Sequence, residues 1–182
     1  EEVRDAVAEI ARTHGKLDGL VANVGGASSR AAAETEPAQW VKMLELNLSA
    51  SFYCAQATRD LLAESEDGSL VIVGALASFH PTPMFAGYGA AKAGVEHLVG
   101  SLAAEWGPEI RVNAVCPGFT DTPLLQRSIE QIMQATGVDR QRAEQQLLQD
   151  NPIGRFTQPQ EVAAAVVFMC QTSACNGHTL RL

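Results

Sequence analysis

Short apolar runs alternate with longer amphipathic segments along almost the whole chain. Four of these runs have the length and composition of buried strands, at residues 17–24, 69–76, 110–115 and 179–182. Helical spacing of apolar residues covers 1–14, 37–63, 88–106 and 159–169, and the polar segment 121–150 is expected to be helical with an interruption at Gly137. Strands separated by helices pair in parallel through right-handed crossovers. The pattern therefore predicts an α/β fold with a three-layer, doubly wound parallel sheet.

The composition fits one globular domain, residues 1–182. Apolar residues make up 46% of the chain and charged residues only 19%, which provides a core and argues against extensive disorder. The net charge of −8 argues against nucleic acid as a partner, because a nucleic-acid binder needs a basic surface. No apolar run is long enough to span a membrane, and the first residues lack a signal-peptide pattern. These features predict a cytoplasmic protein without a membrane partner.

The cysteines and the two ends of the chain add further expectations. The four cysteines are irregularly spaced without a CxxC pair, so we expect reduced thiols and neither a metal site nor disulfides. The first residues already read as a helix with no strand before it, and the last strand has barely begun where the sequence stops. We therefore expect N-terminal strands and a C-terminal end that this sequence does not include.

Tyr88 and Lys92 form the first candidate for chemistry. They lie four residues apart at the start of a strongly periodic helix, so both side chains project from one face. A lysine ammonium beside a phenol favours the phenolate, and we expect it to lower the tyrosine pKa. A phenol tuned in this way exchanges a proton with a substrate oxygen. The alternative interpretation is a core tyrosine beside a solvated lysine.

The context of this pair is more specific than the pair itself. Asn23-Val24-Gly25 ends the first apolar run, Asn47 lies within Leu46-Asn47-Leu48, and the third run ends in Asn113-Ala114-Val115-Cys116-Pro117-Gly118, with Thr122 beyond. In this order and spacing, together with Tyr88-Gly89-Ala90-Ala91-Lys92, the motifs resemble those of the short-chain dehydrogenase/reductase family across nearly the whole chain. The resemblance implies a Rossmann-like sheet.

The resemblance also implies roles for individual residues. Tyr88 would be the acid/base, Lys92 would lower its pKa and hold the nicotinamide ribose, and Asn47 would support a water chain at a helix irregularity. Residues 121–150 would form a mobile segment over the substrate. The residues near the cofactor, NAD or NADP, would be Asn23, Gly25, Tyr88, Lys92, Pro117, Gly118, Thr120 and Thr122. Alternative interpretations remain open for Asn23 as a sheet residue, Asn47 as a helix-surface residue, and Pro117-Gly118 as a simple turn.

Three features depart from the family pattern. The glycine-rich phosphate loop is absent, and so is the residue that selects NAD or NADP. The catalytic serine of the family lies thirteen residues before the tyrosine, where this chain has Ala75. Ser78 is the nearest hydroxyl, and we expect it to replace the missing group in part.

Two functions follow from these observations. The first is an NAD(P)-dependent oxidoreductase that transfers a hydride between a nicotinamide cofactor and a small-molecule substrate, a secondary alcohol or ketone. The second is a non-catalytic family member that keeps the fold for association, which the loss of the serine and of the phosphate loop favours. We also expect a homodimer or homotetramer through helices 37–63 and 88–106, with Phe52, Val99 and Trp106 as candidate contacts. The alternative for all three residues is a place in the internal core. Without the missing strands, the strand at 17–24 would be an open apolar edge, and cofactor binding would be weak.

Overall fold

A four-stranded parallel sheet forms the centre of the molecule in the computed structural model, which describes residues 2–149 and 151–182. The strands are β1 (Gly19–Ala22), β2 (Gly68–Val73), β3 (Ile110–Cys116) and β4 (Thr179–Arg181), and they pair in the order β1-β2-β3-β4. Each pairing is parallel, with Leu20 opposite Leu70 and Leu70 opposite Val112. The α/β fold expected from the sequence is confirmed, although β1 and β2 end earlier than their apolar runs.

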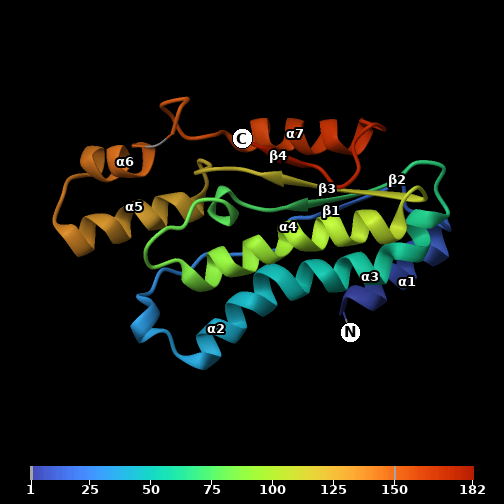
Figure 1. The fold of residues 1–182 in the computed structure, drawn as a ribbon, viewed down its shortest axis with the longest axis horizontal. Coiled ribbons are helices and arrows are strands. Elements are labelled where there is room, and N and C mark those ends of the chain that lie inside the picture. Colours follow the sequence, from blue (N-terminus) through green and yellow to red (C-terminus); the bar gives the residue numbers. More distant parts are fainter. Residues whose placement is uncertain (1, 150) are drawn as a thin grey trace.

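Helices cover the sheet on both faces (Figure 1). One face carries α1 (Glu2–His14), α3 (Ala50–Ala63) and α4 (Ala86–Trp106), while α7 (Pro159–Gln171) lies on the other. Among the described residues, no helix is both long enough and apolar enough to cross a membrane.

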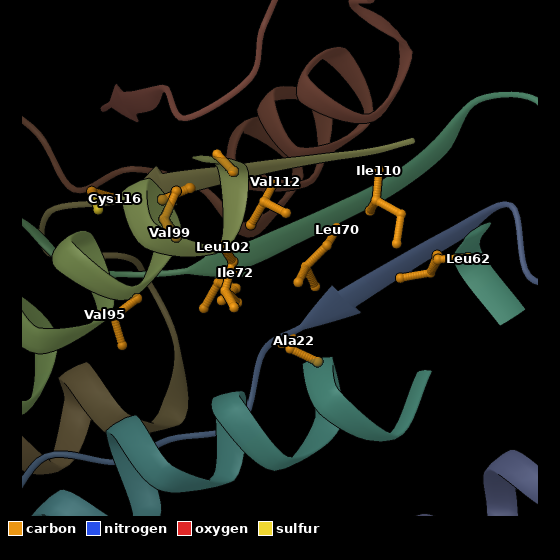
Figure 2. Packing of buried hydrophobic residues seen from close by; sticks show 13 residues of the cluster. Ala22, Leu62, Leu70, Ile72, Val95, Val99, Leu102, Ile110, Val112 and Cys116 are labelled. Atoms are coloured by element: carbon orange, nitrogen blue, oxygen red, sulfur yellow. The ribbon is translucent and has the colours of Figure 1, made fainter. Parts of the chain in front are cut away.

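The alternation of side chains along the strands builds two cores, and Figure 2 shows the one beneath α3 and α4. Leu70 and Ile72 point with Val112 toward α3 and α4, whereas Val71 and Val115 point toward α7. On β1 the second face is less covered, and Val21 is 46% exposed. This matches the expectation that β1 presents an apolar edge, since it pairs only with β2 within the described residues.

Val99, one of the candidate residues for contacts between subunits, lies in the core. Val99 is only 1% exposed and packs within the core under α4, so of its two alternatives the core position is correct and the interface contact is excluded. Its position on α4 faces the sheet, which removes it from any surface contact. Trp106 is half-buried against the same core, and Phe52 is 36% exposed on α3.

The helical segment 37–63 is not one regular α-helix. It consists of α2 (Pro37–Leu44), a π-helical turn (Glu45–Ser49) and α3 (Ala50–Ala63). A π-turn accommodates one residue more than an α-helical turn, and such turns occur often at functional sites. Asn47 lies at its centre and is fully buried.

Of the polar segment 121–150, residues 121–149 are described and contain two helices beyond the end of the sheet (Figure 1), while residue 150 lies outside the described residues. These are α5 (Pro123–Thr136), whose N-terminus is capped by Thr122, and α6 (Arg140–Leu148). Gly137 separates them in the left-handed conformation, with φ of 72°, as the expected interruption. The two helices pack on each other around Leu125 and Ile129, so this segment has a small core of its own.

Candidate active site

Residues from three separate parts of the chain meet at the carboxyl ends of β1, β2 and β3. The loop after β1 contributes Gly25 and Gly26, the π-turn contributes Asn47, and α4 contributes Tyr88 and Lys92. In open parallel sheets this edge is the usual place for a ligand site.

Asn47 holds the loop after β1 through its side-chain amide. Its Oδ1 accepts a hydrogen bond from the Gly26 backbone N–H at 3.0 Å, and its Nδ2 donates to the Gly26 carbonyl at 2.9 Å. A third hydrogen bond runs from Nδ2 to the Met43 carbonyl at 3.1 Å. Asn47 is therefore not a helix-surface residue, because both its amide oxygen and its amide nitrogen form hydrogen bonds inside the protein.

Gly25 lies directly between Asn47 and Lys92. A Cβ atom added to Gly25 would lie 2.8 Å from Asn47 Oδ1 and 3.4 Å from Lys92 Nζ. Real Cβ atoms essentially never come as close as the first of these distances, so a side chain at this position would force the Asn47 amide to shift. The two distances also show that the Asn47 amide and the Lys92 ammonium both lie next to the backbone at Gly25.

The Lys92 side chain is buried, with 4% of its surface exposed, and its Nζ donates to the Val73 carbonyl at 2.8 Å. Burial lowers the pKa of this ammonium, while the charges of Cys116 and Glu96 act in the opposite direction. An ammonium has three N–H donors, and only one is engaged with the described residues. The remaining donors fit a pair of ribose hydroxyls, so the residues present suit the nicotinamide half of a dinucleotide.

Tyr88 lies in the first turn of α4, half-buried, with its ring edge toward Phe85 at a centroid distance of 6.3 Å. Burial raises the pKa of Tyr88 to about 12, and the nearby Cys116 acts in the same direction. The expectation that Lys92 lowers this pKa is therefore wrong for this conformation. The physical reason is that loss of hydration of the phenolate outweighs any attraction to the ammonium, which donates to the β2 carbonyl instead.

The loop after β3 is fixed by backbone contacts. The Pro117 carbonyl accepts from Leu76 N at 3.0 Å, and Gly118 N donates to the Leu182 carbonyl at 3.2 Å. Thr120 pairs with Thr157 in an isolated bridge, and the Thr122 hydroxyl donates to the Thr120 carbonyl at 3.2 Å. The loop therefore leads from β3 into α5 as a defined structure rather than as a simple turn.

Asn23 and Ser78 are not joined to the other candidates by hydrogen bonds among the described residues. Asn23 is exposed directly after β1. Ala75, at the position of the family serine, is buried in extended backbone, and Ser78 closes the short turn that follows through its N–H to the Ala75 carbonyl. The Ser78 hydroxyl is enclosed and lacks a hydrogen-bond partner among the described residues, so its proposed role stays a prediction.

A polar cluster around the half-buried Glu96, one helical turn after Lys92, was missed by the sequence reasoning. The Cys116 thiol donates to Glu96 Oε1 at 2.8 Å, and the Thr179 hydroxyl donates to the other oxygen of the same carboxylate. Burial and Glu96 together raise the pKa of the Cys116 thiol. The available signal was the spacing, because Glu96 follows Lys92 by four residues on the helix face that also carries Tyr88.

A cavity with a volume of about 220 Å³ opens beside Tyr88. Its walls come from the segment after β1, from α2 and from the start of α4, with Met43 and Gly87 close to the tyrosine. Of the candidate site residues, Tyr88 is the one that lines this cavity among the described residues.

Comparison with known proteins gives consistent matches along the chain. Residues 1–182 match a family model described as enoyl-(acyl carrier protein) reductase. Galactitol 2-dehydrogenase from Rhizobium johnstonii is 36% identical over 160 residues, covering 85% of this chain and 58% of that protein. An inactive 2-(S)-hydroxypropyl-CoM dehydrogenase from Xanthobacter autotrophicus is 34% identical, covering 93% of this chain and 72% of the relative. The chain thus spans 58% of one of these relatives and 72% of the other.

A solved structure has the same fold as this chain. The crystal structure of actinorhodin polyketide ketoreductase with NADPH superposes with a TM-score of 0.92 at 28% identity, covering 100% of this chain and 71% of that one.

Proposed function

Because this chain belongs to the short-chain dehydrogenase/reductase family, we propose that it forms the catalytic part of an oxidoreductase acting on a small secondary alcohol or ketone. The observation that carries the proposal is the approach of Lys92 and Asn47 to Gly25, at the sheet edge where α4 also presents Tyr88. A nicotinamide cofactor, NAD or NADP, supplies or accepts the hydride when bound.

Tyr88 moves the proton that accompanies the hydride. With its pKa near 12, the residue is a neutral phenol at neutral pH, and its O–H donates to the carbonyl oxygen of a ketone during reduction. In the opposite direction the phenolate accepts the proton of the alcohol. The state of Tyr88 in the free protein therefore suits reduction.

Lys92 and Asn47 position the surrounding groups. The free N–H donors of the Lys92 ammonium hold the ribose hydroxyls of the cofactor, while its bond to Val73 fixes the direction of the side chain. Asn47 keeps the loop after β1 in place through Gly26. The further residues that we propose at the cofactor are Asn23, Gly25, Pro117, Gly118, Thr120 and Thr122.

Tyr88→Phe tests the proposal in the full-length protein. It removes one oxygen, and we expect kcat to fall at least about 100-fold, which corresponds to about 2.7 kcal/mol of transition-state stabilisation. Tyr53→Phe is the matched control, because Tyr53 is 58% exposed on α3 and loses the same atom. Near-normal kcat in Tyr88→Phe would remove Tyr88 from the reaction.

A specific observation favours the second candidate, a non-catalytic family member. Ala75 occupies the position of the serine that the family resemblance places thirteen residues before the tyrosine. One relative reported above is itself named as inactive. Ketone reduction by the wild type and by Ala75→Ser separates the two functions. If the protein is an enzyme, the substitution raises kcat or leaves it unchanged. If the protein binds NADPH but neither form reduces any ketone of a broad panel, it is a non-catalytic member.

We also propose that the protein assembles as a homodimer or homotetramer. Phe52 and Tyr53 lie exposed on α3, and Val41 is 49% exposed on α2. Light scattering at micromolar concentration that gives only a monomer contradicts this assembly.

A further inference from the structure

The cavity beside Tyr88 is lined by this residue and by two cationic side chains. Arg30 and Lys42 both line it, and no carboxylate does. This is notable in a chain whose net charge is −8. The electrostatic character of the cavity is therefore opposite to that of the protein as a whole.

Neither cation is neutralised by a neighbour. Within residues 2–149 and 151–182, the side chains of Arg30 and Lys42 form no ion pair and no hydrogen bond. Arg59 and Arg111, by contrast, each contact a carboxylate. The two cationic groups of the cavity remain available to a ligand.

The walls that carry these residues are held together by the backbone. Arg30 N donates to the Met84 carbonyl at 2.8 Å, which joins the segment after β1 to the loop before α4. Met84 adopts a left-handed conformation with φ of 69°. Such strain in a residue other than glycine costs free energy and is concentrated at ligand sites. Arg30 is thereby positioned over the cavity that contains Tyr88.

We propose that the substrate carries an anionic group, a carboxylate or phosphate, which Arg30 and Lys42 bind while the reacting carbonyl lies at Tyr88. This inference rests on the proposed function. The ketone carbon gains the hydride of the reduced cofactor, its oxygen gains the proton of Tyr88, and the anionic group is unchanged. The volume of about 220 Å³ lies below that of sites for drug-sized ligands, so the substrate is a small keto or hydroxy acid or a small sugar phosphate.

The test begins with binding, which does not depend on turnover. Butyrate and butyramide have nearly the same shape and differ in charge, and inorganic phosphate represents the other anion class. We expect butyrate or phosphate, and not butyramide, to shift the Arg30 Nε–Hε resonance of the full-length protein, and 0.5 M NaCl to weaken the effect because the groups are exposed. Whichever anion binds more tightly identifies the anion class.

Substitutions connect the binding to the two side chains. Arg30→Gln and Lys42→Gln should each weaken binding of the preferred anion about threefold and the double variant about tenfold, as for solvent-exposed ion pairs. Arg4→Gln is the matched control, since Arg4 lies exposed on α1, away from the cavity, and loses the same charge. Equal binding of butyrate, phosphate and butyramide, no binding of any, or full anion binding in the double variant would overturn the inference.

Turnover then separates this inference from the proposed function. Acetoacetate should be reduced with a lower KM than methyl acetoacetate, and the double variant should remove that difference in KM. If neither ketone is reduced with NADH or NADPH while the anions bind as expected, the anion site stands and the proposed function is weakened. If acetoacetate and methyl acetoacetate are reduced equally well, the proposed function stands and the proposed anion site is wrong.

Discussion

Replacing Asn47 with alanine should cost the protein a large share of its stability. The substitution removes all three hydrogen bonds that the buried amide makes to Gly26 and Met43. At about 1 kcal/mol for each bond, the free energy of unfolding should fall by about 3 kcal/mol. For a chain of this size, that loss corresponds to a decrease in Tm of roughly 6–12 °C.

Urea denaturation of the full-length protein measures this loss. Asn23→Ala is the matched control, because Asn23 lies at the same sheet edge but is exposed and makes no side-chain hydrogen bond to the described residues. The control should change the free energy of unfolding by less than about 0.5 kcal/mol. Equal losses in the two variants would refute the reasoning that the Asn47 amide holds the loop.

Asn47→Asp provides a second test with a defined sign. The new oxygen would replace the Nδ2 donor and face the carbonyl oxygens of Gly26 and Met43. An ionised carboxylate is repelled there, whereas a protonated one donates to one of these oxygens. The variant should therefore be closer to the wild type in stability at pH 4 than at pH 7, and the opposite order would contradict this geometry.

Three further predictions concern the residues around the site. In Tyr53→Phe protein, ultraviolet titration should show the remaining phenol of Tyr88 ionising near pH 12, above the usual value of about 10. Because the folded state then holds this proton more tightly than the unfolded state, the associated stability is present below about pH 10 and is lost as the pH rises toward 12; a midpoint at or below 10 contradicts the burial argument. Ser78→Ala should reduce kcat at least tenfold, about 1.4 kcal/mol, if Ser78 replaces the missing hydroxyl, and an unchanged rate excludes that role. Gly74→Ala should destabilise the protein by about 1–3 kcal/mol in thermal unfolding, because its Cβ would overlap the sulfur of Cys116, and Gly100→Ala, with no atom near its Cβ, is the control that should show no such loss.

The strand-and-helix alternation was sufficient to predict the fold, because each apolar run had to be buried between helices. The long helix that begins near Tyr88 was recognisable from its periodicity, which runs as far as Trp106. The four-residue spacing of Tyr88 and Lys92 placed both on one helix face. These features depend on local patterns that any parallel sheet of this kind imposes.

Features that depend on tertiary contacts were not accessible in the same way. Residues 37–63 have continuous helical periodicity, so periodicity alone does not indicate the π-turn, and only the family resemblance implied a helix irregularity at Asn47. Periodicity also does not tell which side of α4 meets the sheet, so it left Val99 open between an interface and the core, where the structure places it. The pKa of Tyr88 depends on its burial, which spacing alone does not contain.

The π-turn also restricts how this gene can change in length. Each residue of a helix rotates the following side chains by about 100°, and a π-turn holds one residue beyond the regular count. Deleting one codon between Glu45 and Ser49 would produce a straighter, regular helix with stronger local hydrogen bonding, yet it would rotate either α2 or α3 away from its partners. Insertions and deletions should therefore be tolerated in the loop between α5 and α6 and rejected in this turn, even where point substitutions are accepted.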